Sequence, residues 1–171
     1  MPTRELVRGA LLIALVAVVT RVIQVPTPAT EGYINVGDAV IVAGALLLGG
    51  RMGGLAGGIG SALADLTGGY THWAPFTLVI KGLEGILIGW LAWRLRPDLR
   101  RPLGLVLGTA ISSLGVTWMV FGYFGVEYLL YSPAPALANL PGNAVQAAAG
   151  VVCGVPLAAA LQARFGQKPL D

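Results

Sequence analysis

Two charged residues stand inside an apolar stretch, where a charge needs a partner. Lys81 and Glu84 lie three residues apart in a run that begins at Pro75. A helix from that point would place both on one face, about 9 and 13 Å from its start. Charges in such positions either meet a polar ligand or are neutralised internally, by each other or by Asp38 or Asp65. The sequence leaves both interpretations open.

Three amide side chains form a second polar stripe. Asn139, Asn143 and Gln146 follow at i, i+4 and i+7 in the segment NLPGNAVQ, so a helix would bring them to one face. Amides donate and accept hydrogen bonds, which suits a heterocycle with ring nitrogens and hydroxyl groups. Hydrogen bonding between helices is the alternative, and the shared face favours a ligand.

Patterns typical of catalysis and metal binding are missing from the sequence. His72 is the one histidine and Cys153 the one cysteine, so a disulfide framework, an HExxH zinc site and a Cys-rich metal site are excluded. No serine has a plausible histidine base, and no Walker motif supports ATP hydrolysis. We therefore expect no enzyme activity and no cofactor in this chain.

The composition predicts a membrane protein. Hydrophobic residues make up 56% of the 171 residues and charged residues 11%, with a mean hydropathy of +0.76. A soluble domain carries about 25% charged residues, so too little polar surface remains to cover a fold in water. The basic residues occur in short clusters between apolar runs, which argues against nucleic-acid binding and for contact with a lipid bilayer.

Six apolar runs predict an all-α membrane protein with six transmembrane helices, forming one domain over residues 1–171. The runs are Leu6–Val25, Val36–Leu48, Met52–Leu66, Pro75–Trp93, Leu103–Phe124 and Leu140–Phe165. As helices, the second and third would span only about 20 and 22 Å of a hydrocarbon core of about 30 Å. We expect them to extend into their loops or to thin the bilayer.

The basic residues predict the orientation. With a cytoplasmic N-terminus, nine of the eleven Lys and Arg residues fall on the inner side, and only Arg21 and Lys81 do not. The nine are Arg4, Arg8, Arg51, Arg94, Arg96, Arg100, Arg101, Arg164 and Lys168. The positive-inside rule then places both termini in the cytoplasm. A cleaved signal peptide is an alternative for the first run, but Arg21 interrupts that run before the small residue Ala29.

The aromatic residues gather on the predicted outer side. Ten of the thirteen fall there, namely Tyr33, Tyr70, Trp73, Phe76, Trp118, Phe121, Tyr123, Phe124, Tyr128 and Tyr131. An interfacial belt alone would populate both membrane surfaces. The excess indicates an outward-facing pocket in which rings stack on a flat ligand, although some of the ten belong to the belt.

Small residues recur at four-residue spacing. The segment GGRMGGLAGGIGSALADL places Gly50, Gly54 and Gly58 in one row, and small side chains let helix backbones approach closely in lipid. We expect a tight helix hairpin, as packing alone or as the wall of a site. Ala10 and Ala14 repeat the spacing in the first run and indicate, more weakly, a contact with another subunit.

The stretch from Tyr33 to Trp90 resembles the S components of energy-coupling factor (ECF) transporters. INVGDAV, GSALADLTGGY, IKGLEG and NLPGNAVQ carry the likeness in this order, and it is greatest to the riboflavin-type group, which includes proteins for vitamin B6 and hydroxymethylpyrimidine. The resemblance implies a six-helix subunit of a prokaryotic plasma membrane that captures a vitamin or precursor outside. It also implies a transmembrane T component and two cytoplasmic ATPases, which use ATP, as partners, and a subunit that topples in the bilayer to release its cargo.

The resemblance also implies where the sites lie. Ala10 and Ala14 match a stripe that faces the T component, although the stripe departs at Val18. Family binding sites lie in the outer half, in the loop after the first helix and in helices four to six. The predicted substrate-binding residues are Asn35, Asp38, Tyr70, His72, Lys81, Glu84, Trp118, Asn139, Asn143 and Gln146.

Two other functions are weaker alternatives. A small integral-membrane enzyme at the outer face would need a nucleophile with its base or a set of metal ligands, and neither is visible. A purely structural membrane protein would not need charges and amides gathered in one half. The substrate stays open among vitamin B6 forms, hydroxymethylpyrimidine, riboflavin and thiamine-like compounds, because all are flat and polar.

Overall fold

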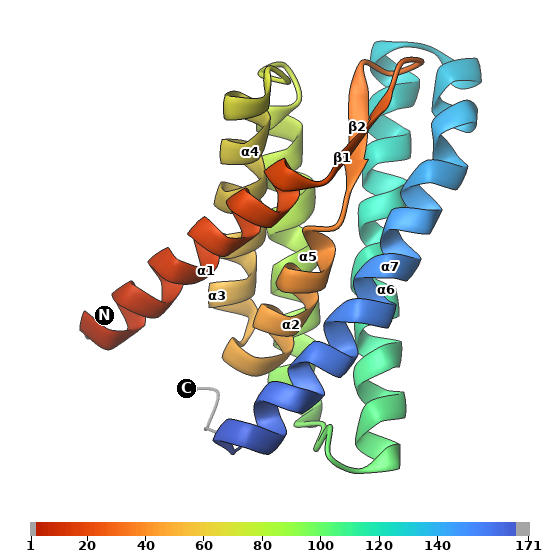
Figure 1. Ribbon diagram of the computed structural model, residues 1–171. Coiled ribbons are helices and arrows are strands. Elements are labelled where there is room, and N and C mark those ends of the chain that lie inside the picture. The colour runs from red at the N-terminus through yellow and green to blue at the C-terminus, as the bar shows by residue number, and fades with distance from the viewer. Residues whose placement is uncertain (1–2, 167–171) are drawn as a thin grey trace.

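The computed structural model describes residues 3–166 and shows a bundle of helices with one short β-hairpin (Figure 1). The helices are α1 (Thr3–Val22), α2 (Asp38–Leu48), α3 (Gly50–Leu55), α4 (Ser61–Gly68), α5 (Ala74–Leu95), α6 (Pro102–Leu130) and α7 (Pro133–Phe165). A π-helical turn, η1 (Ala56–Gly60), joins α3 to α4. Lys168, predicted on the inner side, lies outside the described residues.

Each predicted apolar run contains a helix or, in the third run, a helix interrupted by the π-turn. Within residues 3–166, α5, α6 and α7 are long and apolar enough to cross a membrane. Three boundaries differ clearly from the predicted runs. The first helix ends at Val22 rather than Val25, and a strand begins at Gln24. Helix α6 continues to Leu130 rather than ending at Phe124, and α7 begins at Pro133 rather than Leu140, with Pro141 inside it. Pro133 fits the first turn of α7, because a backbone N–H in the first turn has no partner within the helix.

A short antiparallel hairpin, absent from the sequence prediction, connects α1 to α2. Strands β1 (Gln24–Thr27) and β2 (Gly32–Asn35) pair with Gln24 opposite Asn35. The hairpin lies at the end of the bundle opposite the α5–α6 connection (Figure 1). The indole Nε1 of Trp73 donates to the carbonyl oxygen of Thr30 over 3.2 Å, which attaches the hairpin turn to the start of α5.

Helices α3 and α5 meet backbone to backbone. A Cβ atom added at Gly85 would lie 2.2 Å from the carbonyl oxygen of Gly53, and one at Gly89 would lie 2.2 Å from the backbone nitrogen of Gly50. Neither position has room for a side chain. The predicted tight packing of the glycine-rich segment is therefore confirmed. Helix α5 also contacts α2.

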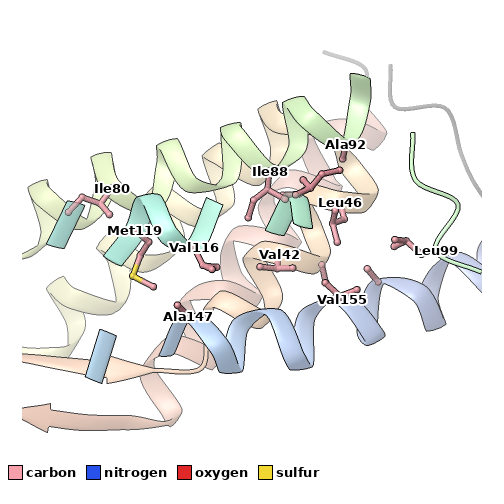
Figure 2. Close-up of a cluster of buried hydrophobic side chains, with 14 residues drawn as sticks. Val42, Leu46, Ile80, Ile88, Ala92, Leu99, Val116, Met119, Ala147 and Val155 are labelled. Carbon is pink, nitrogen blue, oxygen red and sulfur yellow. The ribbon is translucent and has the colours of Figure 1, made fainter. Parts of the chain in front are cut away.

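The main apolar core lies between α2, α5, α6 and α7 (Figure 2). It includes Val42, Leu46, Ile80, Ile88, Ala92, Leu99, Val116, Met119, Ala147 and Val155. Helix α2 contacts α1, α3, α5 and α7, and its residues from Val40 to Leu46 are all buried. Because the surrounding helices cover α2 on all sides, apolar residues are favoured at every position of this short run.

Candidate functional site

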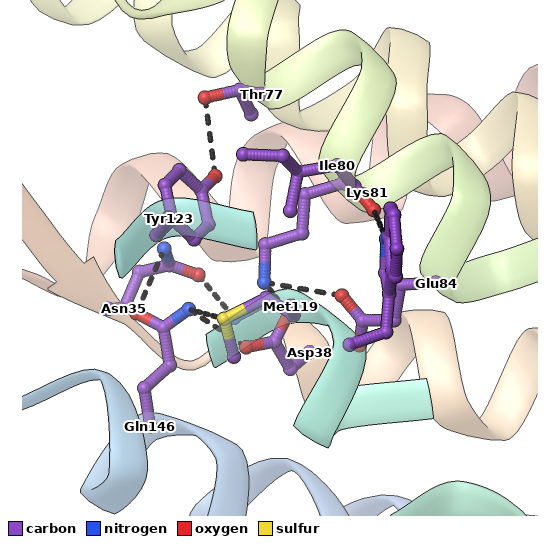
Figure 3. Close-up of polar contacts among 11 residues, drawn as sticks. Asn35, Asp38, Thr77, Ile80, Lys81, Glu84, Met119, Tyr123 and Gln146 are labelled. Atoms are coloured by element: carbon purple, nitrogen blue, oxygen red, sulfur yellow. Dashed lines mark hydrogen bonds and ion pairs between the residues drawn. The ribbon is translucent and has the colours of Figure 1, made fainter. Parts of the chain in front are cut away.

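Lys81 on α5 is the centre of a buried ion-pair network (Figure 3). Its ammonium group pairs with the carboxylate of Asp38 at the start of α2 and, over 3.3 Å, with that of Glu84 one turn further along α5. These side chains are 2% exposed or less. The predicted internal pairing is therefore confirmed for Asp38 and Glu84. Asp65, the other candidate, forms no ion pair with Lys81 in the described part of the chain.

Gln146 on α7 connects this network to the hairpin (Figure 3). Its Nε2 donates to Asp38 Oδ2 over 2.8 Å, and its Oε1 accepts from the backbone N–H of Asn35 over 2.7 Å. Asn35 Oδ1 in turn accepts from the backbone N–H of Gly37. One amide thus holds β2, α2 and α7 together, using both its donor and its acceptor.

The other two residues of the amide stripe lie beside a carboxyl group of α6. Asn139 Nδ2 donates to Glu127 Oε1, and all three side chains of this group are buried, with Asn143 4% and Glu127 2% exposed. Glu127 Oε2 and Asn143 Nδ2 make no hydrogen bond with residues 3–166. Buried polar atoms are normally paired, so this acceptor and this donor need a small movement toward each other or another partner.

A third polar group joins the hairpin to α4. The hydroxyl group of Tyr33 donates to Asp65 Oδ1 over 2.5 Å, and the Tyr33 ring lies 4.6 Å from that of Tyr70, centroid to centroid. Burial and the Asp65 carboxylate raise the pKa of the Tyr33 phenol far above its usual value, so the phenol stays protonated and donates.

Replacing Tyr33 with phenylalanine tests this attachment. The variant Tyr33→Phe leaves the buried Asp65 carboxylate without its donor, which is expected to lower stability by about 1–3 kcal/mol. Thermal unfolding in detergent measures the change. Tyr70→Phe is the matched control, because it keeps the ring pair and the Tyr33–Asp65 hydrogen bond. Equal melting temperatures for the two variants would show that the hydrogen bond does not hold the hairpin.

These three groups surround a cavity of about 30 Å³, which has room for one or two water molecules. Its lining comes from α1, β2, α4, α5, α6 and α7, with Thr20 and Ser61 contributing hydroxyl groups and Trp73 and Tyr123 aromatic rings. Side chains from six elements thus converge on one small polar space. A ligand larger than a few water molecules has to move the hairpin or side chains as it enters.

Comparison with known proteins assigns the chain to a family. A sequence profile of the ECF-type riboflavin transporter S component matches residues 1–163. The chain belongs to this family. It is therefore a membrane protein and an S component for a vitamin-type substrate, as the resemblance of its motifs predicts.

Relatives and a solved structure are similar over most of this S component. An uncharacterised protein of Pyrococcus woesei is 44% identical over 151 residues, covering 88% of this chain and 97% of that protein. The thiamine precursor transporter HmpT of Lactococcus lactis subsp. cremoris is 31% identical over 150 residues, covering 87% and 82%. The crystal structure of an S component for biotin has the same fold, with a TM-score of 0.55 and 19% identity over 92% of this chain and 94% of that one.

The predicted substrate-binding residues of the S component fall into two groups. Five line the cavity directly, namely Asn35, Lys81, Asn139, Asn143 and Gln146, and Asp38 and Glu84 lie behind Lys81. Tyr70 reaches the cavity only through the ring of Tyr33. His72 and Trp118 do not line it: His72 Nε2 lies 3.2 Å from the Tyr131 hydroxyl group, and Trp118, 42% exposed, donates to the carbonyl oxygen of Ile80.

Several lining residues of the S component were not among those predicted. Asp65 and Glu127 are acidic residues in or near apolar runs, the same signal that identified Lys81 and Glu84, so the sequence did contain a pointer to them. Thr20, Ser61 and Thr77 have no such signal, because single hydroxyl side chains are common in apolar helices. Their place in the lining depends entirely on how the helices pack.

Proposed function

We propose that this S component captures a small water-soluble vitamin or vitamin precursor outside the cell, in the cavity around Lys81. The observation that carries the proposal is the set of buried polar side chains, from six elements, that converge on this cavity in a member of an S-component family. The ligand would pass to the cell through a T component and two cytoplasmic ATPases. These partners would use ATP, and the S component itself would hold no cofactor.

The proposed topology has six transmembrane helical segments in a prokaryotic plasma membrane, with both termini in the cytoplasm. The charge distribution supports it, because Arg96, Arg100 and Arg101 lie at the α5–α6 connection, at the end of the bundle away from the hairpin (Figure 1). In this orientation the hairpin, whose strand β2 lines the cavity, lies at the outer end of the bundle. The hairpin would then stand between the cavity and the external solution.

The class of substrate is supported by the names of the relatives. The family profile describes riboflavin transporters and HmpT is a thiamine precursor transporter, so flat, polar heterocycles recur among them. We propose a ligand of this class, with riboflavin, vitamin B6 forms and hydroxymethylpyrimidine as its members. The convergence of aromatic rings and hydrogen-bonding side chains on one cavity suits such molecules.

The proposed contact with the T component is the outward face of α1. Ala10 and Ala14 are exposed there, whereas Gly9 and Val16 on the other side of the helix are buried in the bundle. Beside this face, a groove of about 1030 Å³ runs between α1, α2 and α7, and leucine is the commonest residue of its lining. An exposed row of small residues next to an apolar groove suits close packing against a partner helix.

Ala14→Trp is expected to separate transport from binding. The bulky ring would hold a partner helix away, so ATP-dependent uptake and co-purification with the T component should fall together, while the isolated subunit keeps its ligand. Mass spectrometry of the small molecule released from the purified, denatured protein identifies that ligand in both forms. Ala110→Trp, at an exposed alanine of α6, is the matched control and should transport normally.

Three results would contradict parts of this proposal. Undiminished uptake by Ala14→Trp would mean that α1 does not contact the T component. Loss of ligand binding as well as uptake would mean that this face of α1 supports the cavity. An unmodified protein that retains no small molecule, binds none of the proposed vitamins and never co-purifies with such partners would contradict the importer function itself.

A further inference from the structure

Two carboxyl groups on different helices line the cavity, and each has one oxygen without a partner. Asp65 on α4 accepts from Tyr33 through Oδ1, and Glu127 on α6 accepts from Asn139 through Oε1. Their other oxygens, Asp65 Oδ2 and Glu127 Oε2, accept no hydrogen bond from any residue of the described range. Both side chains are only 2% exposed, so solvent does not compensate for the missing donors.

The positive charge of Lys81 does not balance these two groups. Lys81 is the one buried basic side chain among the residues that the structure describes, and its ammonium group already pairs with Asp38 and Glu84. Arg21, which follows the lining residue Thr20, is exposed and donates to Gln24 Oε1. Four buried carboxyl groups therefore share a single buried ammonium group, and the excess of acid faces the cavity.

This imbalance selects the charge of the ligand. A buried carboxylate is strongly disfavoured unless a counter-charge or hydrogen-bond donors compensate for it. A positively charged ligand supplies the counter-charge, and one whose charged nitrogen carries N–H groups also supplies the donors. An anion would add to the repulsion. The rings of Tyr33, Trp73 and Tyr123 line the same cavity, and aromatic faces attract cations.

Resting on the proposed function, we propose that this S component recognises a small heterocycle that carries a positive charge, on a quaternary or protonated nitrogen. The charged nitrogen lies between Asp65 and Glu127, and its N–H groups, where present, donate to the two free oxygens. The ligand then completes the hydrogen bonding that the protein leaves open. Asn143 Nδ2, which also has no partner within residues 3–166, donates to an acceptor atom of the same ligand.

Calorimetric titration of the purified full chain in lipid nanodiscs tests this inference with four probes. Thiamine carries a fixed positive charge, hydroxymethylpyrimidine is an aminopyrimidine that accepts a proton, riboflavin is neutral and biotin is an anion. At least one of the first two is expected to bind more tightly than riboflavin and biotin. A hydrogen bond to a charged group is worth about 10- to 150-fold in affinity, so Glu127→Gln and Asp65→Asn should each weaken that probe by such a factor.

A matched control and a test of folding distinguish loss of ligand binding from loss of the fold. Glu31→Gln changes an exposed carboxyl group of the hairpin turn and should leave the affinity unchanged. Size-exclusion profiles establish that each variant is folded, and the two carboxyl positions test the inference independently. Riboflavin or biotin binding most tightly, or affinity for the cationic probe unchanged in both variants, would overturn the inference while leaving a vitamin-binding S component. Binding of no probe, together with no retained small molecule, would refute the proposed function and the inference with it.

Discussion

Lys81→Met is expected to remove most of the folded protein. The substitution keeps the volume of the side chain but leaves Asp38 and Glu84 buried without a counter-charge. Breaking a buried ion pair by removing one partner costs about 3–5 kcal/mol, which is a large part of the total stability of a typical domain. The yield of monodisperse protein on size-exclusion chromatography and the melting temperature in detergent measure the loss.

Two companion variants identify the cause. Glu84→Gln keeps the pair between Lys81 and Asp38, so it should fold nearly as well as the unmodified protein. A triple variant that combines Lys81→Met with Asp38→Asn and Glu84→Gln removes all three charges together. It is expected to recover folded protein, because no unpaired charge remains buried. If Lys81→Met alone folded normally, the network would not be needed for stability and its charges would serve the ligand instead.

Gly85→Ala is the second substitution expected to have a large effect. The added methyl group would lie 2.2 Å from the carbonyl oxygen of Gly53, so α3 and α5 would have to separate along their whole contact. Overpacking of this kind costs about 3 kcal/mol at its upper end. For a chain of this size that corresponds to a fall in melting temperature of about 6–12 °C, measured by thermal unfolding in detergent.

Gly82→Ala on the same helix is the matched control. A Cβ atom at Gly82 would have its nearest neighbours 3.7 Å away, which is an ordinary contact distance. Alanine is a better helix former than glycine by about 1 kcal/mol, so this variant should be as stable as the unmodified protein or more stable. Similar losses in both variants would mean that the bundle does not depend on backbone contact between α3 and α5.

The short polar stripes were readable because a helix repeats every 3.6 residues. Lys81 and Glu84, and likewise Asn139, Asn143 and Gln146, were placed on common faces from their spacing, and all five are buried. The glycine spacing predicted close packing for the same reason. These arrangements each lie within one helix, so the geometry of the helix backbone is sufficient to infer them.

The hairpin and the start of α7 could not be predicted in this way. The segment from Gln24 to Asn35 contains two prolines and no alternating apolar pattern, so nothing local predicts strands there. Its conformation depends on contacts with distant residues, including Trp73, which donates to its turn, and Gln146 on α7. The residues before Leu140 read PAPALAN, with two prolines and an asparagine, so an apolar run alone places the start of the last helix seven residues too late.

By itself, the sequence determined that this is a membrane protein of helical hairpins, which side chains share a helix face, and where glycine permits close approach. These properties follow from composition and from the local repeat of the helix. The tertiary structure decided that Lys81 pairs with Asp38, that Tyr33 meets Asp65, and that Glu127 faces Asn139. Each of these contacts joins different elements, so it depends on how helices rotate and approach one another, and no spacing along the chain specifies that.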